Sequence, residues 1–201
     1  MRLLPAGDRA LLVELGNLDE VLGYYAALTA DPPAEVIDIV PAAHTVLVTT
    51  SGPLGALSQA LRAVTPAGTT QVARDLIEIP VTYDGADLDD VARLLGCSVS
   101  EVVARHTGDE WTVAFCGFSP GFGYLTSAGT WNLPRRESPR TKVPVGAVAL
   151  AGEFSGVYPR ESPGGWQLIG RTTVRIFDQD REPAALFHPG RRVRFVDAGR
   201  G

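Results

Sequence analysis

The sequence predicts an α+β chain in two parts, a small α/β unit followed by a β-barrel. In the first 80 residues, short apolar runs alternate with two stretches of helical periodicity. Beyond about residue 110, short β-rich runs are separated by loops rich in Gly and Pro, which is typical of closed or strongly curved sheets. With 201 residues, 45% of them hydrophobic, the chain can bury a substantial core in one large or two small domains.

The first part, residues 1–80, has the element order of a ferredoxin-like domain. Apolar runs predict four strands, at Ala10–Leu15, Glu35–Val40, Thr45–Thr50 and Asp75–Ile79. Apolar residues at helical spacing predict two helices, at Leu18–Leu28 and Pro53–Val64. The resulting order, β-α-β-β-α-β, is the split arrangement of ferredoxin-like folds.

The second part, residues 81–201, begins with a helical entry segment at 81–110. One helix is predicted at Asp87–Leu95 with Asp87 as its cap, and another from Ser98 to about His106 with an S-x-x-E capping box. The rest is β-rich and turn-rich. The predicted strands are Trp111–Cys116, Ala147–Ala151, Gln167–Gly170, Thr173–Phe177 and Arg192–Val196.

Composition excludes several classes of function. The formal net charge of -5 argues against a nucleic-acid partner, which usually requires a basic face. No stretch approaches the roughly 20 apolar residues of a membrane span, and no signal peptide is evident, so we expect a cytoplasmic protein without a membrane partner. Two cysteines and three scattered histidines form no metal signature, so no metal is expected, and Cys116 is expected to be a small buried thiol.

Three loop motifs are the most informative part of the chain. They read G-F-S-P-G-F-G-Y-L at 117–125, R-R-E-S-P-R-T-K-V-P-V-G at 135–146, and Y-P-R-E-S-P-G-G-W-Q-L-I-G-R-T at 158–172. Glycine permits positive φ and close approach of the backbone, proline fixes φ, and arginine offers a planar set of donors. The motifs therefore predict rigid loops that present polar groups among aromatic walls, and such loops tend to carry function.

Each motif supplies candidate site residues. Phe118, Phe122 and Tyr124 are expected to wall a pocket or, alternatively, to plug the barrel end. Arg140 and Lys142 are candidates for contact with a small anion, although a structural salt bridge from Arg135 or Arg140 is an equally good interpretation.

The third motif and a nearby helix complete the set of candidates. Gly164 and Gly165 offer backbone N–H groups to an oxyanion, and Trp166 either lines the pocket or is buried in the barrel. His106 is the candidate general acid or base, with a helix C-terminal cation as the alternative. No catalytic triad can be assembled, which suggests that the chain supplies only part of an active site.

In this order the motifs resemble the allophanate hydrolase subunit 1 family, the carboxyltransferase domain, subdomains C and D, which includes the B subunit of 5-oxoprolinase and the kinase A inhibitor KipI. The resemblance implies a ferredoxin-like first part and a cyclophilin-like β-barrel second part. It also implies a subunit of an ATP-dependent 5-oxoprolinase, which converts 5-oxo-L-proline to L-glutamate. ATP would bind to the complex and not necessarily to this chain.

The same resemblance implies partners and leaves alternatives open. The expected partner is a second carboxyltransferase-like subunit, similar to allophanate hydrolase subunit 2 or to the C subunit of 5-oxoprolinase, with a third oxoprolinase component also taking part. One alternative is a subunit that acts on allophanate or urea. The other is a KipI-like inhibitor of a sensor histidine kinase.

Overall fold

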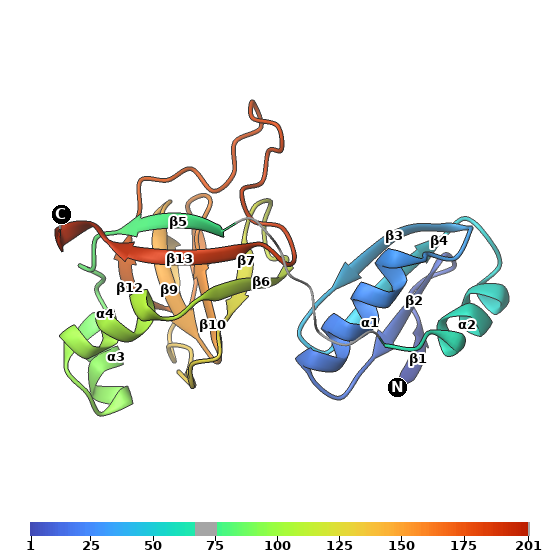
Figure 1. Cartoon of the computed structure of the whole chain (residues 1–201), viewed down its shortest axis with the longest axis horizontal. Coiled ribbons are helices and arrows are strands. Elements are labelled where there is room, and N and C mark those ends of the chain that lie inside the picture. The colour runs from blue at the N-terminus through green and yellow to red at the C-terminus, as the bar shows by residue number, and fades with distance from the viewer. Residues whose placement is uncertain (67–75, 201) are drawn as a thin grey trace. The chain divides into compact units, whose positions relative to one another are not determined.

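The computed structural model describes residues 1–66 and 76–200. Contacts divide the chain into two compact units, Met1–Val72 and Ala73–Gly201, which we describe separately (Figure 1).

The first unit is a four-stranded antiparallel sheet with two helices. The strand order is β1-β2-β4-β3, with β1 at Arg2–Pro5, β2 at Ala10–Glu14, β3 at Val36–Pro41 and β4 at Thr45–Thr50. The helices α1 (Leu18–Ala30) and α2 (Leu54–Ala63) confirm the two predicted from their apolar spacing. Their apolar faces pack with β2 and β4 around Val13, Val21 and Leu61.

The predicted ferredoxin-like order is not completed within this unit. Asp75 lies outside the described residues, and the remainder of the predicted fourth strand forms β5 (Leu76–Val81), which pairs in parallel with β13 (Arg192–Asp197) of the second unit. Burial explains this placement, because Ile79 and Val81 are buried in the second core. The edge of the first sheet beside β2 is occupied by β1, which was not predicted from the sequence.

The second unit is built on a seven-stranded sheet that nearly closes into a barrel (Figure 1). The strand order is β12-β9-β10-β7-β6-β13-β5, with β6 at Trp111–Cys116, β7 at Gly123–Thr126, β9 at Ala147–Ala151, β10 at Phe154–Val157 and β12 at Gln167–Arg171. The two edge strands are joined just beyond β5, where Thr82 and Arg171 exchange backbone hydrogen bonds of 2.8 and 2.9 Å. The predicted barrel is thus confirmed.

Smaller elements complete the unit. A two-stranded ribbon pairs β8 (Arg140–Val143) with β11 (Ser162–Gly164), and a short 3-10 helix, η1, spans Ala198–Arg200. The predicted strand at Thr173–Phe177 is wrong. This segment begins a long loop between β12 and β13 that rises away from the barrel (Figure 1), and its one bridge joins Phe177 to Ala185.

The helical entry segment contains α3 (Leu88–Leu95) and α4 (Val99–Gly108). The capping box at Ser98 and Glu101 is present, as predicted. Asp87 stands at the N-cap position of α3, but its side chain makes no capping hydrogen bond and points to other partners described below. No helix among residues 1–66 and 76–200 is long and apolar enough to cross a membrane.

Candidate functional site

A small aromatic pocket in the second unit collects residues from all three loop motifs. It is lined by Phe118, Phe122, Tyr124, Arg135, Tyr158, Gly164, Gly165 and Trp166. Six of these were predicted as site residues from the sequence, and the fold brings them together although up to 48 positions separate them in the chain. The pocket has a volume of about 60 Å³. Pockets that enclose small ligands usually measure roughly 300–1,000 Å³, so this one cannot enclose a substrate without further walls.

Phe122 is the centre of the aromatic wall. Its ring meets four others edge-on, with centroid distances of 5.1 Å to Tyr124, 5.3 Å to Tyr158, and 5.4 Å to both Phe118 and Trp166. Edge-to-face contacts of this kind are favourable beyond the area they bury. Phe122 and Trp166 are also buried in a hydrophobic cluster, so these rings both line the pocket and fill the interior.

Phe118 is held at the pocket in an unfavourable backbone conformation. Its φ of 66° lies in the left-handed region, which costs a bulky L-residue on the order of 1–3 kcal/mol. The turn is fixed by hydrogen bonds from Ser119 N to Gly117 O (2.7 Å) and from Phe122 N to Ser119 O (3.0 Å). The ring nevertheless remains 59% exposed. A strained loop that presents an exposed aromatic ring is the local pattern expected of a contact surface.

Arg135 is the cation of the pocket, and it was not among the site residues predicted from the sequence. Among the described residues it has no hydrogen bond or ion pair, and its positive charge opposes the rise in the pKa values of Tyr124 and Tyr158 that burial causes. Its guanidinium is therefore available to an anionic group. The only sequence signal was its place next to Arg136 in the second motif.

A backbone hydrogen bond ties the second motif to the third. The N–H of Arg136 donates to the carbonyl of Gly165 at 2.8 Å. The N–H of Gly165 itself has no hydrogen-bond partner among the described residues and remains available to an oxyanion. The fold thus places a free guanidinium and a free amide on one pocket.

Arg140 does not line the pocket, because Asp87 holds it. The Asp87 carboxylate is 2% exposed and accepts from Arg140 Nη1 (2.8 Å) and Nη2 (2.7 Å), Arg136 Nη1 (2.7 Å) and Leu168 N (2.7 Å). Burial raises the pKa of Asp87, but the hydrogen bonds from Arg140 and Leu168 and the charges of Arg140 and Arg136 outweigh it, so the pKa is lowered. The structural salt bridge weighed for Arg140 is the arrangement observed.

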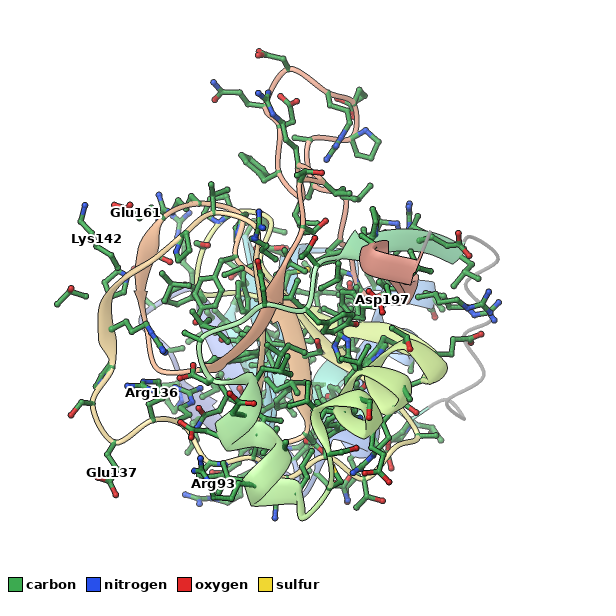
Figure 2. All side chains as sticks on the ribbon, turned by 90° about the vertical axis from the view of Figure 1, so that its left-hand side faces the viewer. Arg93, Arg136, Glu137, Lys142, Glu161 and Asp197 are labelled. Atoms are coloured by element: carbon green, nitrogen blue, oxygen red, sulfur yellow. The ribbon has the colours of Figure 1, made fainter. Side chains whose placement is uncertain are left out.

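Lys142 also lies outside the pocket. Its ammonium is 3.1 Å from Glu161, and both side chains are exposed at the surface, where Figure 2 shows them next to each other. An exposed pair of this kind contributes little to stability. The two basic residues chosen as anion contacts are therefore placed elsewhere, and Arg135 takes their position.

His106 is buried in the core of the second unit, away from the pocket. Its Nδ1 lies 2.7 Å from the Tyr83 hydroxyl, its Nε2 lies 2.9 Å from Ser155 Oγ, and its ring stacks on Phe195 at 4.3 Å. Burial lowers the pKa of His106 to about 3. The ring is therefore neutral near pH 7, so the interpretation as a helix C-terminal cation is wrong, and its polar atoms already have partners.

Two further groups limit the chemistry available. Burial raises the pKa of the Cys116 thiol to about 11, which makes it a poor nucleophile. In residues 1–66 and 76–200, no cluster of three or more His, Cys, Asp or Glu side chains is placed to hold a metal ion. The pocket offers an aromatic wall, one cation and one amide, and no complete catalytic set within the described chain.

The two glycines of the third motif provide a test of the pocket. A Cβ on Gly164 would lie 2.3 Å from the Tyr158 hydroxyl, whereas a Cβ on Gly165 would meet nothing closer than 3.7 Å. We expect Gly164→Ala to displace the Tyr158 ring and to reduce activity of the assembled enzyme about tenfold or more. Gly165→Ala, the matched control, should retain activity within about twofold. Equal activity of the two variants would contradict the placement of Tyr158 in the site.

Comparisons with known proteins agree with this arrangement. The chain matches the family model of the carboxyltransferase domain, subdomain C and D, over residues 1–187. It is 48% identical to the B subunit of 5-oxoprolinase from Escherichia coli O157:H7 over 129 residues, which are 62% of this chain and 59% of that protein. It is 42% identical to the B subunit of 5-oxoprolinase from Bacillus subtilis (strain 168) over 130 residues, 63% of this chain and 54% of that protein. The matches thus span less than two thirds of these relatives.

Solved structures share the fold. The crystal structure of TTHA0988 has a TM-score of 0.77 and 36% identity, and the match covers 94% of this chain and 40% of that one. A conserved uncharacterized protein from Pyrococcus horikoshii has a TM-score of 0.59 and 34% identity, with 99% of both chains covered. Kluyveromyces lactis urea carboxylase has a TM-score of 0.72 at 18% identity, with 98% of this chain and 21% of that one covered, which shows a common fold alone.

Proposed function

Because the chain belongs to the carboxyltransferase domain, subdomain C and D family, we propose that it is a subunit of an ATP-dependent 5-oxoprolinase. Relatives named as the B subunit of 5-oxoprolinase, at 48% and 42% identity, support this proposal. The reaction is the opening of 5-oxo-L-proline to L-glutamate. The subunit works in the cytoplasm, and its second unit has a cyclophilin-like barrel.

The observation that carries the proposal is the incomplete pocket. 5-Oxoproline is a small ring with one carboxylate and one lactam carbonyl, and the pocket offers the matching groups. The free guanidinium of Arg135 suits the carboxylate, the rings of Phe122 and Tyr124 suit the faces of the lactam, and the free N–H of Gly165 suits the carbonyl oxygen. At about 60 Å³, the pocket requires walls from another polypeptide before it can enclose this substrate.

The partner in this proposal is a second carboxyltransferase-like subunit, similar to the C subunit of 5-oxoprolinase. It completes the pocket and contributes the proton-transfer group that this pocket lacks. ATP activates the lactam by phosphorylation in the paired subunits, and a third oxoprolinase component hydrolyses the product. The aromatic pocket itself is too small for a nucleotide.

Reconstitution of the complex tests the proposal. We expect 5-oxoproline-dependent ATP hydrolysis with all subunits present and a fall to background when this chain is omitted. Urea and allophanate, offered to the same mixture, should give no substrate-dependent ATP hydrolysis. Unchanged turnover without this chain would overturn the assignment, and turnover with allophanate alone would redirect it to the related amidohydrolase activity.

A further inference from the structure

A second and larger groove lies in the barrel unit. It has a volume of about 490 Å³, within the usual range for small-ligand sites. Its walls include Val145, Gly146, Pro159, Arg171, Thr172 and Phe177. The first five of these belong to the second and third loop motifs, in the parts that the aromatic pocket does not use.

Backbone hydrogen bonds join the motif segments into one rigid wall. Gly146 donates its N–H to Tyr158 O at 2.8 Å and accepts from Thr172 N at 2.8 Å. Gly146 has a φ of 79°, and a Cβ there would lie 2.2 Å from Thr172 O. Only glycine combines this conformation with so close an approach. The groove is therefore shaped by the motif residues themselves.

The opposite wall is fixed from both sides. Gly121, with a φ of 83°, approaches Phe177 so closely that a Cβ would lie 2.5 Å from Phe177 Cβ. Beyond Phe177, Arg181 donates hydrogen bonds to the carbonyls of Arg175 (3.0 Å), Ile176 (3.2 Å) and Ala184 (3.0 Å). The loop that carries the groove's outer residues is thus braced although it leaves the barrel, and it adjoins the turn that holds the aromatic pocket.

The lining combines cations with an apolar surface. The Arg175 side chain is 81% exposed, and its nearest carboxylate, Asp178, lies 3.6 Å away, beyond hydrogen-bonding distance. Arg171 uses only its Nε for Asp84, at 2.8 Å. Its terminal nitrogens have no hydrogen bond among the described residues. The 64% exposed side chain of Val145 and the ring of Phe177 form the uncharged side.

We propose that this groove binds a compact organic anion, with its carboxylate or phosphate at Arg175 and Arg171 and its uncharged body against Val145 and Phe177. Guanidinium groups with free donors recognise both kinds of anion. Their existing carboxylate neighbours, Asp84 and Asp178, are exposed or loosely engaged and can be replaced as partners. The inference rests on the proposed function, under which 5-oxoproline and ATP are the two available anions.

Steady-state kinetics of the reconstituted complex distinguish these two ligands. Arg175→Gln should raise the KM of one of them, 5-oxoproline or ATP, by about tenfold or more, because a charge-assisted contact is lost. Val145→Glu should raise the same KM further, since it adds a like charge at the exposed rim without disturbing the core. Arg194→Gln is the matched control. It is a surface arginine with an equally loose partner, Glu78 at 3.7 Å, and it does not line the groove.

The outcomes separate this inference from the proposed function. If the wild-type complex turns over 5-oxoproline and both groove variants keep both KM values, the groove proposal fails and the function stands. If the wild-type complex shows no such turnover, direct calorimetric titration of the full chain with 5-oxoproline and with ATP decides the groove alone. Binding that Arg175→Gln and Val145→Glu weaken would support the site, and the absence of binding by either compound would overturn it.

Discussion

Replacing Asp87 with alanine is expected to destabilise the barrel unit by about 3–5 kcal/mol, because removing one member of a buried ion pair leaves its partners uncompensated. In this protein the loss affects two guanidinium groups, Arg136 and Arg140, and also leaves the N–H of Leu168 without its acceptor. Urea denaturation followed by tryptophan fluorescence at neutral pH measures the change.

The matched control for this variant lies three residues further along the chain. Asp90→Ala removes an exposed carboxylate that pairs with Arg93 at 2.9 Å. We expect a change within about 0.5 kcal/mol for that variant. Similar losses in the two variants would show that the Asp87 cluster does not carry the stability assigned to it.

The Asp87 cluster also has an acid limit. The pKa of Asp87 is lowered in the folded state, so its stabilisation is complete above the unfolded value of about 3.9 and is lost as the pH falls from there through the lower folded pKa. Asp87→Asn should remove this dependence. The cluster also positions the pocket, because Arg136 binds Asp87 through its side chain and Gly165 through its backbone N–H.

The second large effect is expected from His106, at milder acidity. Burial lowers the pKa of this residue from 6.5 to about 3. Protonation of the unfolded chain then favours unfolding as the pH drops. The stabilisation is fully present above about pH 6.5, and it declines by about 1.4 kcal/mol per pH unit as the pH falls toward the folded value. Over the whole interval the loss is on the order of 5 kcal/mol, comparable with the total stability of many domains.

The variant His106→Gln isolates this effect. Glutamine keeps a donor and an acceptor for the Tyr83 and Ser155 hydroxyls but does not titrate. We expect the variant to be less stable than wild type near neutral pH and to show a flatter pH dependence between about pH 6.5 and 4.5. His188→Gln, at an exposed site, should keep the wild-type slope. An unchanged slope in His106→Gln would mean that the imidazole is not held neutral in the core.

Local signals in the sequence were reliable where the physics is local. The helices at Leu18–Ala30 and Val99–Gly108 follow from apolar spacing and a capping box, which depend on neighbours within one or two turns. The aromatic pocket was also predictable in part, because Phe122, Tyr124 and Trp166 occur in loops whose Gly and Pro residues restrict the backbone.

Partner choice was decided by the tertiary structure. The sequence marked Leu76–Val81 as a strand but not which sheet it joins, since pairing with β13 depends on contacts more than 100 residues away. Likewise, three arginines within six positions are alike in sequence. A buried carboxylate, Asp87, engages Arg136 and Arg140 and leaves Arg135 free at the pocket.

The amino-acid sequence by itself determined the family, the rigid character of the three loops and the aromatic wall, because these reside in residue type and near neighbours. The tertiary structure alone decided which cation serves the pocket, that His106 is a neutral core residue, and that the motifs divide between two cavities. Charge, burial and cavity shape depend on every element that surrounds a side chain, and residues distant in the chain supply those elements.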